Sequence, residues 1–216
     1  MIVDTTELRT RAATLADTDA IAAIYNEGIA DRIATFETDP RSAAQIAEWF
    51  TGRQLVIVAD TEETGPVAFA APFPYSARPC YAGIGEFSVY VRRDYRGRGA
   101  GRTVLTALIE AANAAGMHKL TSRVFPENIA SRALLKRLGF AEIGIHRRHG
   151  KLDGLWRDCV IVERLLDEDQ KWSAVFARLF GSGFAGLGIA QHDGISAKSW
   201  RAYVQCDLIA TEILKA

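Results

Sequence analysis

IGEFSVYVRRDYRGRGAGRTVLTALIEAA, residues 84–112, joins an apolar run, a loop rich in arginine and glycine, and an amphipathic run. The spacing predicts a strand over 84–91 and a helix beginning near Arg102. Three glycines leave the loop without bulky side chains, so that several backbone N–H groups can point at one anion. The positive end of the following helix points to the same place. The segment therefore predicts an anion site, for which a pyrophosphate is a natural occupant.

Two other nucleotide-binding loops fit this segment less well. A P-loop would end in Gly-Lys-Ser/Thr, whereas Gly101 is followed by Arg102 and Thr103. A dinucleotide fingerprint needs GxGxxG after the first parallel strand, whereas this loop reads GxGxG and lies in the middle of the domain. A tight basic turn without a ligand is the remaining alternative.

Composition limits the other classes of function. The chain has 216 residues, 49% apolar and 24% charged, enough for one folded domain and an extension. Lys and Arg together number 26, as do Asp and Glu, so no overall charge favours nucleic acid or a membrane as partner. Three separated cysteines predict neither a zinc site nor a disulfide framework and suit a cytoplasmic location. The first residues, MIVDTTELRT, lack the apolar core of a signal peptide.

The remaining segments predict one mixed α/β domain over residues 1–166. The expected order is βααβββαβαββ, with strands at 8–12, twice within 54–75, at 84–91, at 118–125 and twice within 141–166. Residues 167–216 include a Gly-rich stretch and are expected to form a partly helical C-terminal extension. No function is predicted for this extension.

The glycine–arginine loop also resembles a known family. RGRGAG, residues 96–101, matches the pattern (Arg/Gln)-x-x-Gly-x-(Gly/Ala) of the GNAT superfamily of N-acetyltransferases, and NIASRALLKRLGF, residues 128–140, resembles the family's downstream segment. The resemblance covers about residues 8–166. It implies the GNAT acyl-CoA N-acyltransferase fold, a mixed, mostly antiparallel central sheet with splayed strands and flanking helices. It further implies acetyl-CoA as the acyl donor and no metal.

The same resemblance implies which residues hold acetyl-CoA. The loop would bind the pyrophosphate, the pantetheine would run along the splayed end of strand 84–91, and Asn128 would touch the cofactor. The expected cofactor-binding residues are Val89, Tyr90, Val91, Arg96, Gly97, Arg98, Gly99, Ala100, Gly101, Arg102 and Asn128.

The N-terminal half narrows the resemblance. IYNEGIADRIATFETDP (24–40) and PFPYSARPCYAGIGEFSVYV (72–91) resemble phosphinothricin-type acetyltransferases, and IATFET (33–38) is most similar to the subgroup that acts on arsinothricin. This implies a homodimer that acetylates the α-amine of a glutamate-like amino acid and so gives antibiotic or herbicide resistance. Methionine sulfone, methionine sulfoximine or another small amine is the alternative acceptor, and a non-catalytic CoA-binding sensor is the alternative function.

Glu86 is the expected general base. A carboxylate on an apolar strand beside the cofactor loop is costly unless it is used or paired, so the alternative is a structural ion pair with an arginine. Tyr90 or water would protonate the leaving thiolate, because Leu135 stands where many relatives carry a tyrosine. Backbone N–H groups of residues 89–91 are expected to stabilise the oxyanion.

Arg78 is the expected ligand for a side-chain phosphinate, arsinate or carboxylate, since a guanidinium can donate two parallel hydrogen bonds. The related group has a basic residue two positions earlier, where this chain has Ser76. Phe36 is expected to wall the substrate side chain or, alternatively, to pack in the core. Tyr75 and Tyr81 are candidate pocket donors.

Other polar and aromatic residues favour ordinary structural roles. His146 and His149 are spaced HxxH, but two arginines lie between them and the spacing is not that of a zinc-binding helix. Arg147 and Arg148 are expected to be solvated. Trp49 and Trp156 are expected to be packing residues.

Overall fold

The fold is described from a computed structural model, which describes residues 8–52 and 54–166. The chain divides into two units, Met1–Asp169 and Gln170–Ala216, and all described residues lie in the first. The predicted C-terminal extension, 167–216, lies outside the described residues. Among the described helices, none is long and apolar enough to cross a membrane.

The predicted order of helices and strands, βααβββαβαββ, is confirmed within the described residues. The strands are β1 (Arg9–Ala12), β2 (Ile57–Thr61), β3 (Gly65–Pro74), β4 (Ile84–Val91), β5 (Lys119–Val124), β6 (Ala141–Leu152) and β7 (Leu155–Leu165). The helices are α1 (Thr18–Ala30), α2 (Ala43–Ala47), α3 (Ala100–Ala114) and α4 (Ile129–Arg137), with 3₁₀ turns at Leu15–Asp17, Glu48–Phe50, Pro79–Tyr81 and Arg93–Tyr95.

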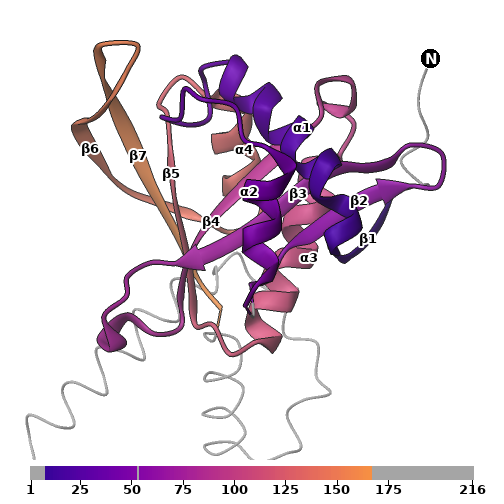
Figure 1. The fold of residues 1–216 in the computed structure, drawn as a ribbon. Coiled ribbons are helices and arrows are strands. Elements are labelled where there is room, and N and C mark those ends of the chain that lie inside the picture. Colours follow the sequence, from indigo (N-terminus) through magenta and orange to yellow (C-terminus); the bar gives the residue numbers. More distant parts are fainter. Residues whose placement is uncertain (1–7, 53, 167–216) are drawn as a thin grey trace, which may run out of the picture. The chain divides into compact units, whose positions relative to one another are not determined.

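The strands form one seven-stranded sheet in the order β1-β2-β3-β4-β5-β7-β6 (Figure 1). Neighbouring strands are antiparallel throughout, except that β4 and β5 run parallel. The predicted GNAT-type sheet, mixed and mostly antiparallel with flanking helices, is therefore confirmed.

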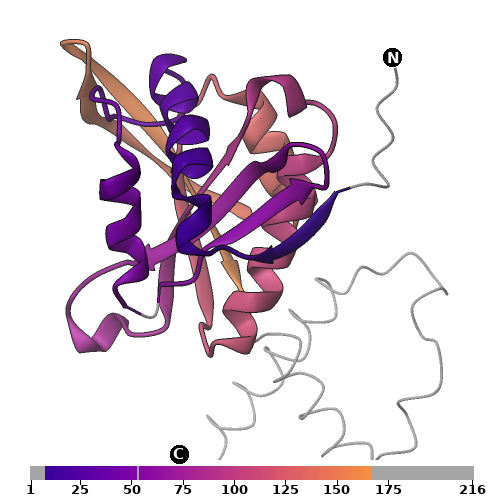
Figure 2. The same cartoon turned by 45° about the vertical axis from the view of Figure 1, so that its right-hand side comes forward.

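Apolar side chains supply a core on each face of this sheet. Figure 2 shows α1 and α2 on one side of the sheet and α3 on the other. Leu108 of α3 belongs to the core that includes Phe87 of β4, and Ile24 of α1 to the core that includes Phe69 of β3. Because β3 is covered on both faces, residues 67–72 are all buried. Full burial of a large apolar side chain such as Phe69 or Phe87 contributes about 1.5–3 kcal/mol to stability. Together the two cores fix the central strands on which the site is built.

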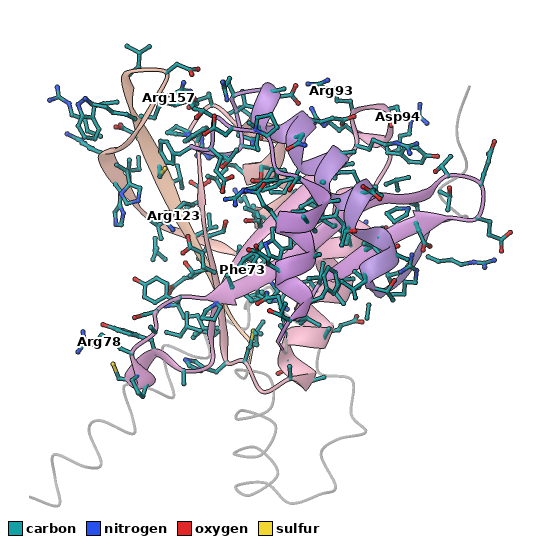
Figure 3. The ribbon with its side chains drawn as sticks, in the orientation of Figure 1. Phe73, Arg78, Arg93, Asp94, Arg123 and Arg157 are labelled. Carbon is teal, nitrogen blue, oxygen red and sulfur yellow. The ribbon has the colours of Figure 1, made fainter. Side chains whose placement is uncertain are left out.

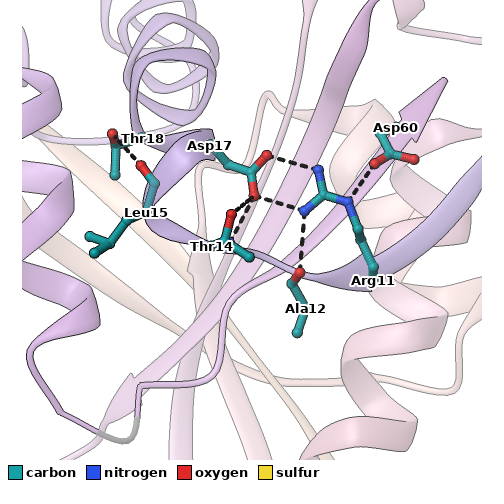
Figure 4. A network of polar contacts seen from close by, with 7 residues as sticks. All are labelled: Arg11, Ala12, Thr14, Leu15, Asp17, Thr18 and Asp60. Carbon is teal, nitrogen blue, oxygen red and sulfur yellow. Dashed lines mark hydrogen bonds and ion pairs between the residues drawn. The ribbon is translucent and has the colours of Figure 1, made fainter. Parts of the chain in front are cut away.

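A network around Arg11 connects the edge strand β1 to the start of α1 (Figure 4). Arg11 donates to both oxygens of the buried Asp17 carboxylate at 2.7 and 2.8 Å, and to Asp60 of β2 at 2.7 Å. The Asp17 carboxylate also accepts from the backbone N–H of Thr14 at 2.8 Å. The Arg11 hydrogen bond, opposed by burial, lowers the pKa of Asp17 to about 2. All four residues of β1 are exposed, so polar contacts rather than apolar burial join this strand to α1.

We expect Asp17→Asn to lower the free energy of unfolding by about 2 kcal/mol at about pH 7, since each unit of pKa shift corresponds to about 1.4 kcal/mol. The folded pKa lies below the ordinary value of 3.8. The stabilisation is therefore fully present above about pH 4 and is lost as the pH falls to about 2. Urea unfolding of the wild-type protein and of Asp17→Asn across this pH range measures the difference in their free energies of unfolding.

Glu62→Gln is the matched control, because it breaks the exposed ion pair with Arg9 and should cost less than about 1 kcal/mol. The role given to the network would be contradicted if Asp17→Asn lowered the free energy of unfolding by no more than this control does. It would also be contradicted if the difference from the wild type did not shrink as the pH falls.

Candidate active site

A cleft opens where β4 and β5 separate. The two strands pair only at Ile84–Glu86 and Lys119–Thr121. Beyond Glu86, the edge of β4 that faces β5 has no partner among the described strands, so its backbone groups are open to a ligand. The cleft is lined by Ala34, Phe87, Ser88, Val89, Tyr90, Ser122, Arg123, Val124, Phe125, Asn128, Ser131 and Leu135. Val89 and Tyr90 thus lie where the pantetheine is predicted to run, whereas Val91 is not among the lining residues.

The glycine-rich loop leads directly into α3. Gly97 and Gly99 have φ angles of +74° and +90°, a backbone region that residues with side chains rarely adopt, and Gly99 is the N-cap residue of α3. The backbone N–H groups of residues 97 and 99–102 donate no hydrogen bond within the described part of the chain. Unpaired donors and the positive end of a helix therefore meet at one place, an arrangement that binds anions.

Arg96 anchors this loop to the end of α1. Its Nη1 donates to Asp31 at 2.6 Å and its Nε to the Val91 carbonyl at 3.0 Å. Arg93 donates to the same Asp31 carboxylate. Burial opposes the ionisation of Asp31, but these hydrogen bonds lower its pKa overall. Arg96 therefore positions the loop, and its direct contact with a cofactor stays a prediction.

Arg98 and Arg102 supply exposed positive charge beside the unpaired amides. Neither forms an ion pair within residues 8–52 and 54–166. The Arg98 guanidinium lies over the ring of Tyr95, 5.5 Å from its centroid. These two side chains are therefore free to approach a phosphate group.

Glu86 forms an ion pair with a residue of β5. Its Oε1 accepts a hydrogen bond from Nε of Arg123 at 2.6 Å, and Nη2 of Arg123 contacts the same oxygen. The ion-pair alternative for Glu86 is therefore realised. However, the two side chains are 27% and 47% exposed, and a pair at such exposure contributes at most about 1 kcal/mol. A bound substrate or water can thus replace the pair at low cost.

A bulge in β6 brings His149 to the same pair. The register of β6 with β7 shifts between His146 and Gly150, and Arg148 within this stretch has φ +48°. His149 Nε2 lies 3.1 Å from Nη1 of Arg123. Burial first, and then the charge of Arg123, lowers the pKa of His149, so the ring is neutral at neutral pH. No group of three or more metal-ligating side chains occurs in the described ranges.

Tyr90 packs in the core beneath α1. Its ring stacks on Phe69 at 5.3 Å between centroids and meets Tyr25 edge-on at 4.6 Å. A Cβ atom at Gly28 would come within 2.6 Å of the ring, so α1 crosses directly over it. Burial, reinforced by Tyr25, raises the pKa of the Tyr90 hydroxyl well above its ordinary value. The residue therefore holds its proton firmly, and its role as the acid stays a prediction.

Asn128 joins the cleft to the loop over residues 31–40. Its side-chain oxygen accepts from the Ser131 N–H at 3.1 Å and caps α4, while its amide donates to the Ile33 carbonyl at 3.0 Å. Leu135, which lines the cleft, is 2% exposed. Because its side chain is aliphatic, this position supplies no proton.

Phe36 packs in a small apolar cluster beside the Glu86 pair. The cluster includes Phe125, whose ring Phe36 meets edge-on at 4.9 Å between centroids. The Phe36 ring also lies 6.4 Å from that of His149. The packing alternative for Phe36 is therefore realised, and its position next to His149 leaves it able to contact a substrate.

The other predicted substrate residues form a separate group in the loop between β3 and β4. Arg78 lies over the ring of Tyr81 at 5.6 Å, and the rings of Tyr75 and Tyr81 are 5.6 Å apart. Figure 3 labels Arg78 on this loop and Arg123 of β5. Arg78 is exposed and makes no ion pair in the part of the chain that the structure describes.

Three members of the site were not predicted from the sequence, namely Arg123, Phe125 and the bulged His149. A charged residue within the predicted strand HKLTSRVF is a weak signal for Arg123. Its partner could not be named, because the pairing of β4 with β5 brings together residues 37 apart in sequence. No local pattern indicates the bulge.

Comparison with known proteins identifies the family. Residues 7–141 match the acetyltransferase (GNAT) domain. The chain is 34% identical over 161 residues to the L-methionine sulfoximine/L-methionine sulfone acetyltransferase of Pseudomonas paraeruginosa, covering 73% of this chain and 94% of the relative. It is 29% identical over 168 residues to the phosphinothricin N-acetyltransferase of Streptomyces coelicolor, covering 75% and 98%.

A solved structure agrees with this assignment. The crystal structure of a GNAT superfamily phosphinothricin acetyltransferase from Sinorhizobium meliloti in complex with acetyl-CoA superposes with a TM-score of 0.69 at 28% identity, covering 74% of this chain and 88% of that one. The chain therefore belongs to the GNAT acetyltransferases and is an N-acetyltransferase.

Gly99→Ala should weaken acetyl-CoA binding about tenfold. A side chain in left-handed backbone costs roughly 1–2 kcal/mol, so we expect the loop to shift its N–H groups away from the anion position. Isothermal titration calorimetry with acetyl-CoA measures the effect. Gly144→Ala is the control, since a Cβ there meets nothing within 4 Å. An unchanged Kd of acetyl-CoA in Gly99→Ala would show that the loop is not part of the cofactor site.

Proposed function

We propose that this N-acetyltransferase transfers the acetyl group of acetyl-CoA to the α-amine of a glutamate-like amino acid of the phosphinothricin or arsinothricin type. The observation that carries the proposal is the meeting of three features: the unpaired N–H groups of residues 97 and 99–102, the open edge of β4, and Glu86 where that edge begins. Relatives that act on phosphinothricin or methionine sulfoximine support the amino-acid class of acceptor.

The donor would lie along the cleft from the loop to Glu86. Its pyrophosphate would accept hydrogen bonds at the start of α3, where Arg98 and Arg102 add positive charge. The amides of its pantetheine arm would pair with the open edge of β4, as an added strand would. This path brings the thioester towards Glu86.

The chemistry follows from that placement. Glu86 takes a proton from the substrate ammonium, directly or through water. The free amine attacks the thioester carbonyl, and backbone N–H groups near Val89 stabilise the charge on the carbonyl oxygen. The carbon–sulfur bond then breaks, the new amide nitrogen loses its second proton to water, and the thiolate of CoA takes a proton. Because Tyr90 is buried and holds its proton firmly, water is the simpler source.

Arg78 would bind the side-chain oxyanion of the acceptor, with Tyr75 and Tyr81 beside it. Its exposed guanidinium and the absence of an ion pair in the described ranges support this role. Methionine sulfoximine or methionine sulfone is the second candidate acceptor, favoured by the relative of that name. These two carry no full negative charge on the side chain and would depend less on Arg78. Resistance to the corresponding antibiotic or herbicide would follow from the first class of acceptor.

A cytoplasmic location is part of the proposal. The free thiols of Cys80 and Cys159 support it, because cysteines stay reduced in that compartment.

Release of free CoA thiol in the presence of phosphinothricin, arsinothricin, methionine sulfoximine and glutamate tests the proposed reaction. We expect turnover with phosphinothricin or arsinothricin to exceed that with glutamate.

Glu86→Gln should lower kcat about 100-fold or more while leaving the Kd of acetyl-CoA within about threefold, because the amide keeps the shape but cannot take a proton. Near-normal turnover would exclude Glu86 as the base. If acetyl-CoA bound but none of the amines reacted, a CoA-binding sensor would be the better description.

A homodimer is the second part of the proposal. Ile143, Ile145, Leu155 and Trp156 on the β6–β7 hairpin are 55%, 58%, 68% and 55% exposed, and several exposed large apolar side chains on one hairpin favour a protein partner. The expectation that Trp156 is a packing residue is therefore wrong within the described residues. Its ring lies near the hairpin turn, with the Lys151 ammonium 5.0 Å from the ring centroid.

Sedimentation velocity should find the wild-type protein at twice the mass of one chain and Trp156→Glu at the mass of a single chain. The same change at Ile129, which is 63% exposed but lies outside the hairpin, should leave the dimer intact. A monomeric wild-type protein would refute the homodimer.

A further inference from the structure

The ion pair between Glu86 and Arg123 has the charge pattern of a free amino acid. Nε of Arg123 donates to Oε1 of Glu86 at 2.6 Å, and Arg123 lines the cleft. A cation and an anion therefore lie side by side at the point where β4 and β5 separate. The head group of an α-amino acid carries the complementary pair, an ammonium and a carboxylate on one carbon atom.

We propose that Arg123 binds the α-carboxylate of the acceptor while Glu86 meets its α-ammonium. This inference rests on the proposed function and makes it more specific, because it restricts the acceptors to zwitterionic α-amino acids and excludes amines that lack the carboxylate. Arg123 is then a specificity-determining residue, separate from Arg78, which would bind the anionic group of the acceptor side chain.

The exchange leaves no charge without a partner. In the free protein the pair is partly exposed and therefore weak, so a ligand can open it. Once a zwitterion is bound, Glu86 faces the ammonium and Arg123 faces the carboxylate. An arginine has several N–H donors in one plane and can bind both oxygens of a carboxylate.

The proton transfer strengthens the case for a bound carboxylate. Within the described residues, Glu86 is the carboxylate that balances the charge of Arg123. When Glu86 takes the ammonium proton it becomes neutral, and Arg123 would then be a half-buried cation without a counter-ion. The substrate carboxylate supplies that counter-ion.

His149 positions the guanidinium without competing for the substrate. Because arginine donates only, Nε2 of His149, 3.1 Å from Nη1 of Arg123, must accept, which makes the ring neutral and places its proton on Nδ1. The charged or titratable groups around the ring are Arg123, Glu86 and His146. A neutral imidazole holds Arg123 in place and leaves its charge available to a carboxylate.

The test compares acceptors that differ only in the carboxylate. Phosphinothricin and methionine sulfoximine are each assayed beside their α-carboxamides, which keep the α-amine and the side chain. Arg123→Ala should lower kcat/KM for the amino acids about 30-fold, mainly through KM, because a hydrogen bond to a charged group is lost. The carboxamides should change by less than about threefold, and Arg123→Lys should recover part of the loss.

Arg147→Ala is the matched control, since Arg147 is an exposed arginine of the β6–β7 hairpin with no ion pair in the described ranges. It should leave both kinds of acceptor unaffected. Equal losses for amino acids and carboxamides would show that Arg123 only positions Glu86 and would overturn the proposal. Unchanged kinetics in Arg123→Ala would overturn it as well. If Arg123→Ala fails to fold, the comparison of amino acid with carboxamide in Arg123→Lys decides between the same outcomes.

Failure of the proposed reaction can be told apart from failure of this inference. If the wild-type protein acetylates none of these amines, calorimetric titration of phosphinothricin and its α-carboxamide into the CoA-bound protein still measures recognition of the carboxylate. Tighter binding of phosphinothricin than of its carboxamide, with the preference lost in Arg123→Ala, would support the role of Arg123 without the reaction. Equal binding of both by the wild-type protein would overturn it.

Discussion

The separation of β4 from β5 is the constraint on which the rest of the site depends. The two strands pair in parallel only as far as Glu86. Beyond it, β4 stays paired with β3 along its length and β5 stays paired with β7, so each strand keeps one full ladder of hydrogen bonds. The sheet therefore tolerates the opening. What the opening leaves is a row of backbone groups that only a bound ligand or water can satisfy.

The arginines of the loop have two different roles in the site. Arg93 and Arg96 are bound to Asp31 at the end of α1, and they hold the loop against the body of the domain. Arg98 and Arg102 stay exposed. Because the charges of Arg93 and Arg96 are balanced by a protein carboxylate, the attraction for an anion comes from the backbone N–H groups, the start of α3, and Arg98 with Arg102.

The acceptor side shows how a chain can depart from the pattern of related enzymes and still retain a coherent site. Ser76 provides no second cation in the loop beside Arg78, and Leu135 provides no hydroxyl in the cleft. Arg123 of β5 places a guanidinium directly beside Glu86 of β4. The positive charge available to an amino-acid substrate is thereby distributed between the β3–β4 loop and the β4–β5 cleft.

The order of the elements, the anion chemistry of the loop and the place of Glu86 on a strand were decided by the sequence itself. Each depends on local spacing: an apolar period, a glycine where φ is positive, a carboxylate on an apolar run. The neighbours of Glu86 were decided only by the tertiary structure. Arg123 reaches it through the register of two strands, and His149 through a bulge in a third. Register and bulges are set by packing over the whole sheet, so no local pattern could have placed these residues together.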